Sequence, residues 1–439
     1  MGAAIDLGLL DLQLPALAPG TKILVAFSGG LDSSVLLHRL AMQAPNRVHA
    51  IHIHHGLQAA ADAWATQCAE ACAKLQIPFS RVHVQVDSDH AAGPEGAARQ
   101  ARYDALRSLM SAGDCLATAH HRDDQAETVL LRLLRGTGVQ GLGGMRALSE
   151  FTPGWLWRPL LEVPRAELRR YAEVQGLHWI DDPHNVDPRY ARSWLRAEVL
   201  PLLQRHFPQA QGSLVRVAQL AEEASGLLDE LAAQDSAVAA RGDALSVASL
   251  LQMSTPRRHN LLRFWLREHA YEVPSANELA RIGTEVLAAA PDTEPRLAWA
   301  GCELRRYRDL LFAMAPLPPP PPSWLLTWTE GCQLQLPDGC GWLEAARVPA
   351  PALTVRAPRA GEAFRPAGGA HARALKNLFQ EAGVPPWVRV RTPVIETDDG
   401  VAVVAGIGCT QRWQAQRQSV IGALHWRHSL CGAASPLAL

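Results

Sequence analysis

The sequence feature that most constrains the fold is a glycine turn between an apolar run and a helical pattern near the N-terminus. Residues 23–27 read Ile-Leu-Val-Ala-Phe, a run typical of a buried strand. The loop Ser-Gly-Gly-Leu-Asp-Ser-Ser follows over residues 28–34, and residues 35–40 continue as a helix. Two adjacent glycines let the backbone approach a ligand closely, and a helix start offers unpaired N–H groups to an anion. The stretch therefore predicts a phosphate-binding loop in an α/β fold.

The side chains of this loop indicate a nucleotide bound together with a metal. Three serines can donate hydrogen bonds to phosphate oxygens. Asp32 would be repelled by bare phosphate, so its presence predicts a Mg2+ between carboxylate and phosphate. An ordinary strand-to-helix turn with a serine N-cap is the alternative interpretation.

The spacing of the loop separates it from two common nucleotide-binding motifs. It lacks the Gly-Lys-Ser/Thr of a Walker A loop and the Gly-x-Gly-x-x-Gly of dinucleotide-binding folds. It resembles the Ser-Gly-Gly-x-Asp-Ser loop of the N-type ATP pyrophosphatases, which implies cleavage of ATP between its α and β phosphates. The resemblance assigns to ATP the residues Ser28, Gly29, Gly30, Leu31, Asp32, Ser33 and Ser34.

Length, composition and cysteine usage bound the class of protein. With 439 residues and 48% apolar residues, the chain is expected to form two or three domains. We find neither an apolar run of about 18 residues nor a signal-peptide pattern, so we expect a soluble cytoplasmic protein without a membrane partner. Eight cysteines without Cys-x-x-Cys spacing predict free thiols. Because the net charge is -1, any polyanion site must be local.

Residues 1 to about 145 alternate short apolar runs with helical patterns, which predicts a parallel sheet wrapped by helices. In such sheets ligands gather at the carboxyl ends of the strands. The further strands are expected at 48–54, 81–86 and 115–119, and the helices between them at 60–75 and 95–110.

Three of the loops after these strands carry residues suited to chemistry. His55 lies at the end of the second strand, and Arg99 lies on the helix after the third strand, where a solvated ion-pair face is the alternative reading. Both residues are expected to bind ATP. After the fourth strand, His120, Asp124 and Glu127 recur at i, i+4 and i+7 and should share one face. Acids at a helix start can simply complement its dipole. That does not explain a histidine and a second acid there, so we expect proton transfer and metal binding at this loop.

A basic helical face follows further along the chain. Arg189, Arg192 and Arg196 recur at three and four residues. Arginine binds phosphate in a bidentate manner and can stack on bases. We therefore expect Arg189 and Arg196 to contact RNA.

Motifs along residues 20–207 resemble the tRNA(Ile)-lysidine synthetase family. In order behind the glycine loop come His-His-Gly-Leu, Ala-Arg-x-x-Arg-Tyr, His-His-x-x-Asp-Gln-x-Glu-Thr, Arg-Pro-Leu-Leu and Asn-x-Asp-x-x-Tyr-x-Arg. The resemblance implies ligation of L-lysine to carbon 2 of the wobble cytidine in the CAU anticodon of tRNA(Ile). The reaction would consume ATP and require Mg2+. It would pass through an adenylated tRNA and release AMP and pyrophosphate. The catalytic residues so implied are His120, Asp124 and Arg192, and we add Glu127 because of its spacing. Ser193 departs from the asparagine common in the family, which predicts a weaker local hydrogen bond.

The rest of the chain is expected to bind the tRNA. Residues 213–315 show a helical alanine and leucine pattern, 316–323 form a proline-rich linker, and 324–439 read as a small α+β domain. Seven basic residues against two acidic ones between 356 and 391 make this segment the best electrostatic RNA patch. The expected RNA contacts there are Arg359, Lys376, Arg389 and Arg391. The catalytic domain is then residues 1–212.

Two alternative functions remain at this point. A tRNA 2-thiocytidine synthetase shares the loop and the histidine motif, but it needs Cys-x-x-Cys pairs for a cluster. A non-catalytic RNA-binding relative would not need the acidic and histidine residues described above. The oligomeric state stays open, a homodimer being one alternative.

Overall fold

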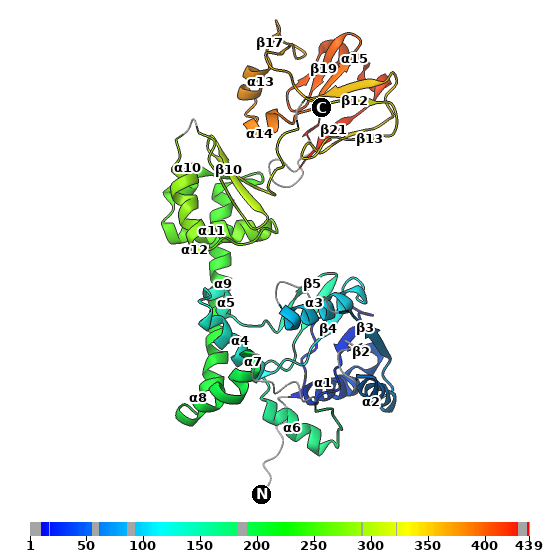
Figure 1. The fold of residues 1–439 in the computed structure, drawn as a ribbon, viewed down its shortest axis with the longest axis vertical. Coiled ribbons are helices and arrows are strands. Elements are labelled where there is room, and N and C mark those ends of the chain that lie inside the picture. The colour runs from blue at the N-terminus through cyan, green and yellow to red at the C-terminus, as the bar shows by residue number, and fades with distance from the viewer. Residues whose placement is uncertain are drawn as a thin grey trace. The chain divides into compact units, whose positions relative to one another are not determined.

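The computed structural model divides the chain into two compact units, residues 1–226 and 227–439, which are described separately (Figure 1). No helix within the described ranges is long and apolar enough to cross a membrane. The structure describes residues 10–16, 18–54, 61–85, 93–181, 191–290, 293–321, 323–428 and 437–438.

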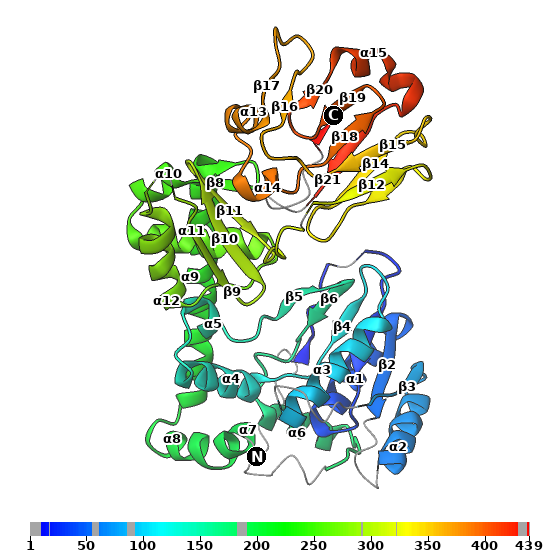
Figure 2. The same ribbon diagram turned by 45° about the horizontal axis from the view of Figure 1, so that its top comes forward.

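The first unit is built on a six-stranded sheet in the order β3-β2-β1-β4-β6-β5 (Figure 2). All neighbouring pairs are parallel except β5, which runs antiparallel to β6. The strands are β1 (Ile23–Ala26), β2 (Val48–His54), β3 (Phe79–His83), β4 (Cys115–Ala117), β5 (Leu148–Phe151) and β6 (Gly154–Trp157). The predicted parallel sheet is confirmed, and each predicted strand begins within a few residues of the observed one.

Helices cover both faces of this sheet because its strands are apolar on both sides. Ile23 and Val25 pack in one core with residues of α1, α2 and α6, whereas Leu24 faces the opposite core with Leu106 near the end of α3. The helical segments of this unit are α1 (Leu31–Gln43), the 3-10 turn Pro45–Arg47, α2 (Ala61–Lys74), α3 (Gly93–Ser108), α4 (Arg122–Leu134), α5 (Val139–Leu142), α6 (Arg165–Val174), α7 (Ala191–Trp194), the π-helical segment Leu195–Val199, α8 (Leu200–His206) and the start of α9 (Ala210–Ala239).

The strand order places the glycine loop at a topological switch point. β1 lies between β2 and β4, so the chain leaves β1 and β4 at the same edge of the sheet. Loops that diverge at the carboxyl ends of adjacent parallel strands leave a crevice where ligands bind. The loop at 28–30 and the residues at 118–121 are therefore brought together, as the sequence predicted.

The middle part of the second unit contains a sheet as well as the expected helices. Its antiparallel strands run in the order β7-β8-β11-β10-β9. The alanine and leucine pattern predicted the helices. The strands near residue 300 were not predicted, because they are short and their alternation of apolar and polar residues covers too few positions. The elements are β7 (Ala240–Arg241), β8 (Ala244–Ser246), α10 (Val247–Gln252), α11 (Thr255–Glu268), α12 (Ala276–Arg281), the π-helical segment Ile282–Leu287, β9 (Arg296–Trp299), β10 (Cys302–Tyr307) and β11 (Leu310–Met314).

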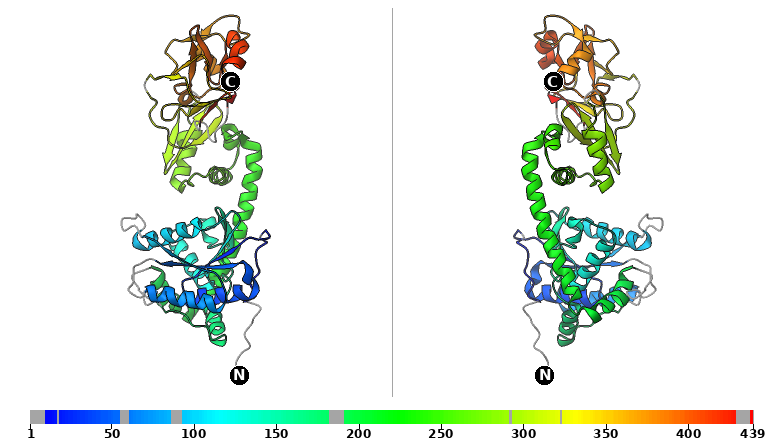
Figure 3. Two further views of the ribbon diagram at one scale, coloured as in Figure 1. Left: turned by 90° about the vertical axis from the view of Figure 1, so that its right-hand side faces the viewer. Right: turned by 90° about the vertical axis from the view of Figure 1, so that its left-hand side faces the viewer.

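The C-terminal part has two larger antiparallel sheets, β12-β15-β18-β19-β20 and β13-β14-β21-β22, as well as the pair β16-β17 (Figure 3). This arrangement agrees with the predicted α+β domain. The elements are β12 (Leu325–Trp328), β13 (Gln333–Gln335), β14 (Trp342–Ala345), β15 (Leu353–Arg356), β16 (Ala363–Phe364), β17 (Arg373–Ala374), α13 (Leu375–Glu381), α14 (Pro386–Arg389), β18 (Val394–Thr397), β19 (Gly400–Val404), β20 (Gly408–Cys409), α15 (Gln411–Val420), β21 (Leu424–Arg427) and β22 (Leu437–Ala438).

The middle and C-terminal parts share one hydrophobic core. Phe312 and Met314 of β11 pack in the same buried cluster as Trp387 and Trp426. The carbonyl of Pro318, in the proline-rich segment, accepts a hydrogen bond from the guanidinium of a buried arginine of the C-terminal part. The described part of that segment thus packs against the domain that follows, instead of standing free as a spacer.

Candidate active site

The glycine loop closes on itself through hydroxyl and backbone contacts. The Ser28 and Ser33 hydroxyls lie 3.0 Å apart, and the Ser34 hydroxyl donates to the Gly29 carbonyl at 3.3 Å. The N–H of Ile180 donates to the same carbonyl at 2.9 Å, which ties the loop to the segment after α6. The side chain of Leu31 is buried in the core beneath the loop. The serine hydroxyls that the sequence assigns to phosphate are therefore gathered at the start of α1.

Replacing Gly29 by alanine is expected to destabilise the protein by at least about 1–2 kcal/mol, because its φ of +82° is costly for a residue with a Cβ. A Cβ there would also lie 2.7 Å from both Cys68 Sγ and Ile180 Cδ1. Gly30→Ala is the matched control, since its φ is −73° and a Cβ would meet Ser28 Oγ at 3.5 Å. Thermal melts without ligand measure the difference, and equal melting temperatures would contradict the steric argument.

Asp32 presents its carboxylate beside two basic side chains. Its Oδ1 lies 3.4 Å from Arg165 Nε, and its Oδ2 lies 3.7 Å from His121 Nε2. Oδ1 is buried and makes no hydrogen bond within the described residues. Apart from its ion pair with Arg165, this oxygen therefore has no hydrogen-bond donor among these residues.

His121 is the residue at this site that the sequence interpretation missed. It is the N-cap of α4, its exposure is 1%, and its Nε2 lies 3.3 Å from Asp124 Oδ2. Its backbone N–H donates to the Asp124 carboxylate at 3.1 Å. Burial alone would lower the pKa of His121, but the neighbouring carboxylates outweigh it and raise that pKa above its ordinary value. His121 thus links the start of α4 to Asp32.

Asp123 lies on the other side of His121 and holds the start of α6. Its Oδ2 accepts a hydrogen bond from the backbone N–H of Arg165 at 3.0 Å and lies 3.6 Å from His121 Nδ1. Burial would raise the pKa of Asp123, but these hydrogen bonds outweigh it and lower the pKa to about 2. Asp123 thus binds the backbone at the start of α6 and the N-cap histidine of α4, and so holds these two helix starts together.

Glu127 and Asp124 form an ion-pair network with Arg196. Glu127 is fully buried, and its two oxygens accept from Arg196 Nε at 2.6 Å and Nη2 at 3.0 Å. Arg196 Nη2 also donates to Asp124 Oδ1 at 2.9 Å. Burial lowers the pKa of Arg196, but the bonds to Glu127 outweigh it and hold the pKa above its ordinary value. The expected RNA contact of Arg196 stays a prediction, and in the structure its guanidinium binds these two carboxylates.

His120 lies just before α4, so it does not continue the helical i, i+4 series expected for it. Its Nδ1 lies 2.9 Å from the Thr118 hydroxyl. Burial is the main reason that the pKa of His120 is lowered to about 4. The imidazole is therefore neutral at pH 7 and can accept a proton through its other nitrogen.

Eight of the predicted site residues line one cavity of about 500 Å³, and Leu31 and Ser33 are among them. Gly29, Ser34, Asp124 and Glu127 are not part of its lining. Arg192 lines a neighbouring pocket instead, and its guanidinium donates to the Thr128 hydroxyl at 3.3 Å. His55 and Arg189 lie outside the described residues. The cavity's lining includes Ser28, Gly30, Asp32, Arg99, His120 and Arg196.

The chemistry of the cavity fits a magnesium ion held jointly with phosphate. Within the described residues there is no group of three or more metal-ligating side chains that could hold a metal unaided. Mg2+ does not need one, because it usually keeps several waters and binds one or two carboxylates together with substrate phosphates. The unbonded Oδ1 of Asp32 is the oxygen suited to it.

The predicted basic patch of the C-terminal part is only partly exposed. Arg359 and Lys376 are exposed. Arg389 donates to the Tyr307 hydroxyl and the Val384 carbonyl at 2.8 Å each. Arg391 is 3% exposed and donates to main-chain carbonyls, so the prediction that it contacts RNA is wrong. Charge counts along a sequence cannot distinguish an arginine that satisfies buried carbonyls from one that faces solvent.

Comparison with known proteins places these parts in one family. Family models match a PP-loop domain at residues 9–203, a TilS substrate binding domain at 245–312 and a TilS substrate C-terminal domain at 353–426. These ranges fall inside the three domains expected from the sequence.

Relatives match over nearly the whole chain. The tRNA(Ile)-lysidine synthase of Xanthomonas axonopodis pv. citri is 44% identical over 94% of this chain and 96% of its own. That of Alkalilimnicola ehrlichii is 41% identical over 93% and 94%. A solved structure of a U34-tRNA thiolase from Methanococcus maripaludis covers 48% of this chain and 75% of its own, at 21% identity and a TM-score of 0.40. The chain belongs to the tRNA(Ile)-lysidine synthase family.

Proposed function

We propose that this protein ligates L-lysine to carbon 2 of the wobble cytidine of tRNA(Ile) with a CAU anticodon, converting ATP to AMP and pyrophosphate. The observation that carries the proposal is the single cavity lined by both the phosphate-binding loop and the His120 segment. This cavity would hold ATP at the loop and would place His120, the proposed proton-transfer residue, beside it. Cytoplasmic location is part of the same proposal, since the tRNA substrate is found there.

The reaction proceeds in two displacements. The oxygen on carbon 2 of cytosine is a poor leaving group, so it first attacks the α-phosphorus of ATP and releases pyrophosphate. The amine of lysine then forms a bond to carbon 2, AMP departs with that oxygen, and the amine loses a proton. Ser28, Ser33 and Ser34 would hold the phosphates, and Asp32 would hold the Mg2+ that supplies charge neutralisation when bound.

The proton of the attacking amine needs an acceptor at the site. His120 is neutral at pH 7, since its pKa is about 4, and it lines the cavity. Asp124 accepts a hydrogen bond from Arg196, and its other oxygen lies 3.3 Å from His121 Nε2, so both of its oxygens are engaged. We assign His120 as the proton acceptor, with Asp124 and Glu127 as positioning residues held by Arg196.

Mass analysis tests the proposed function directly. An unmodified tRNA(Ile) carrying the CAU anticodon is incubated with the protein, Mg-ATP and labelled lysine. The expected product is tRNA carrying one lysine, formed together with AMP. A tRNA whose wobble cytidine is replaced by uridine is the control and should remain unlabelled. AMP formation without labelled tRNA would contradict the proposal.

Thiolation of cytidine is the second candidate and is disfavoured by the cysteines. Burial raises the pKa of Cys68 and of Cys72 to about 12, so neither thiol provides a thiolate at neutral pH. Both lie in the hydrophobic core behind the sheet. Labelled sulfur in the product, in place of lysine, would revive this candidate.

The C-terminal part is proposed to hold the tRNA through its exposed basic residues. We expect Arg359→Ala to raise the Kd for tRNA and to reduce the salt-dependence slope by about one, because one phosphate contact is lost. Arg391→Ala is expected to lower thermal stability without changing tRNA affinity, because this side chain is buried. Filter binding at several salt concentrations and a thermal melt of each variant measure both effects. The reverse pattern would remove the RNA role from Arg359.

A further inference from the structure

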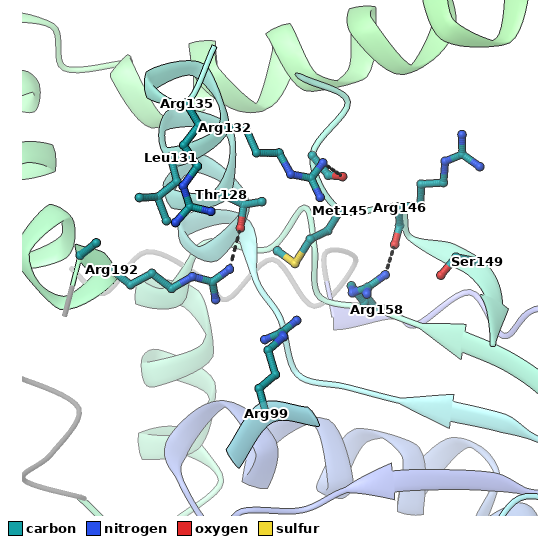
Figure 4. A pocket seen from close by; sticks show the side chains of 12 residues that line it. Arg99, Thr128, Leu131, Arg132, Arg135, Met145, Arg146, Ser149, Arg158 and Arg192 are labelled. Atoms are coloured by element: carbon teal, nitrogen blue, oxygen red, sulfur yellow. Dashed lines mark hydrogen bonds between the residues drawn. The ribbon is translucent and has the colours of Figure 1, made fainter. Parts of the chain in front are cut away.

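A second pocket of about 440 Å³ in the first unit is lined mainly by arginines (Figure 4). Among the described residues, its lining includes no aspartate or glutamate. The lining side chains come from α3, α4, α7 and the segment around β5 and β6. We call this cavity the arginine pocket. Its arginines are Arg99, Arg132, Arg135, Arg146, Arg158 and Arg192.

Of the pocket arginines, only Arg146 forms an ion pair with a carboxylate of the described residues. Arg146 Nε lies 3.4 Å from Glu222 Oε1. Arg132 donates instead to the Gly141 and Gly144 carbonyls at 2.7 Å each. Arg192 donates to a hydroxyl, and Arg158 donates to the Arg146 carbonyl at 2.8 Å. These bonds orient the guanidinium groups without neutralising them.

The positive charges raise one another's electrostatic energy. Burial and the charge of Arg192 lower the pKa of Arg132 below its ordinary value. Burial also lowers the pKa of Arg158; Tyr103 acts in the opposite direction, and Arg99 and Arg132 lower the pKa further. Uncompensated like charges at partly buried positions are costly, and a bound anion relieves that cost. In a chain whose net charge is only -1, so local an excess indicates a site for a polyanion.

The arginine pocket adjoins the cavity assigned to ATP. Arg99 of α3 lines both, and Thr128, which lines the pocket, lies one residue after Glu127 on α4. A cytidine whose carbon 2 faces the α-phosphate of ATP carries one phosphate on each side of its ribose. Several guanidinium groups exceed what one free phosphate needs, but they match successive phosphates of a strand.

We propose that the arginine pocket binds the sugar-phosphate backbone of the RNA beside the cytidine being modified. This assignment rests on the proposed function. It gives the first unit its own RNA contact, independent of the C-terminal basic residues. Backbone contacts fix the register of the strand, and the base is then left for the catalytic cavity.

The test compares variants of one exposed pocket arginine with a control on the protein surface. Arg135 is exposed and makes no hydrogen bond or ion pair through its side chain within the described residues, so Arg135→Gln should fold. Arg107→Gln makes the same change in charge outside the pocket, at an arginine already paired with Asp104 at 2.6 Å. Filter binding of tRNA is measured from low to high salt, with a thermal melt of each protein.

We expect Arg135→Gln to weaken tRNA binding several-fold at low salt and to reduce the salt slope by about one. The double variant Arg132→Gln, Arg135→Gln should reduce the slope by about two, and Arg135→Lys should restore most of the loss. Lysidine formation at saturating tRNA should persist in Arg135→Gln. Arg107→Gln should match the unmodified protein.

Two results would overturn the proposal. One is a folded Arg135→Gln variant with the slope and affinity of Arg107→Gln. The other is unchanged tRNA binding together with weaker inhibition by added pyrophosphate, which would make the pocket a site for the free anion. Failure of the unmodified protein to form lysidine would instead refute the proposed function, and the slope comparison would still report whether RNA lies in the pocket.

Discussion

Asp32→Ala is expected to reduce AMP formation by at least about 100-fold, the scale seen when one group that stabilises transition-state charge is removed. Asp32 supplies the unbonded oxygen next to the serine hydroxyls of the phosphate-binding loop. Without it, the charge of the leaving pyrophosphate would lack a protein-held cation. The effect should fall on the rate at saturating ATP and tRNA more than on tRNA binding.

The control for this change must show that the fold survives. Asp32 is about a quarter exposed, and His121 keeps Asp123 and Asp124 as partners after its removal. We therefore expect a thermal melt within a few degrees of the unmodified protein. Asp104→Ala removes an exposed acid of α3 and should leave AMP formation unchanged. A folded Asp32→Ala protein that still releases AMP at the normal rate would disprove the assignment of Mg2+ to this carboxylate.

Glu127→Ala is expected to cost about 3 kcal/mol of stability, the low end of the range for breaking a buried ion pair, because Arg196 remains partly solvated. Glu127 is fully buried and binds Arg196 through both oxygens. Its loss leaves Arg196 with Asp124 alone, which allows the π-helical segment that carries Arg196 to shift relative to α4. We also expect lysidine formation to fall strongly, because Asp124 loses its fixed position.

Glu127→Gln separates the charge of this residue from its shape. The amide oxygen can still accept one bond from Arg196, so about half of the stability should return. If Glu127 acts only through Arg196, then Arg196→Met should reduce the rate as much as Glu127→Ala does. Denaturant unfolding and turnover at saturating substrates measure the two effects. Unchanged unfolding in Glu127→Ala would contradict the network.

The alternation of strands and helices and the glycine loop could be predicted because both are local. The strand at 23–27 is a continuous apolar run, as expected for a parallel sheet covered on both faces, whereas the strand at 48–54 is apolar apart from its histidines. Two adjacent glycines followed by an acid and two serines leave few other conformations for the loop. The identity of lysine and of the tRNA, by contrast, came only from resemblance, because the loop chemistry is shared by many acceptors.

The partners of individual side chains could not be predicted. His121 and His120 are adjacent in the sequence, and only the N-cap geometry of α4 shows that His121 is the residue facing Asp32. The signal available was the spacing of three residues between His121 and Asp124, which suits a capping box. Arg196 was interpreted as an RNA contact because nothing local reveals that it meets Glu127, which lies 69 residues earlier.

The core shared by the middle and C-terminal parts sets the order in which the second unit can form. Phe312 and Met314 leave the ribosome well before Trp387 and Trp426, the side chains that bury them. Domains usually complete themselves during synthesis, starting from the N-terminal side. Here β11 keeps an apolar face open until Trp387 and Trp426 have been made, so β21 completes a domain that begins almost two hundred residues earlier.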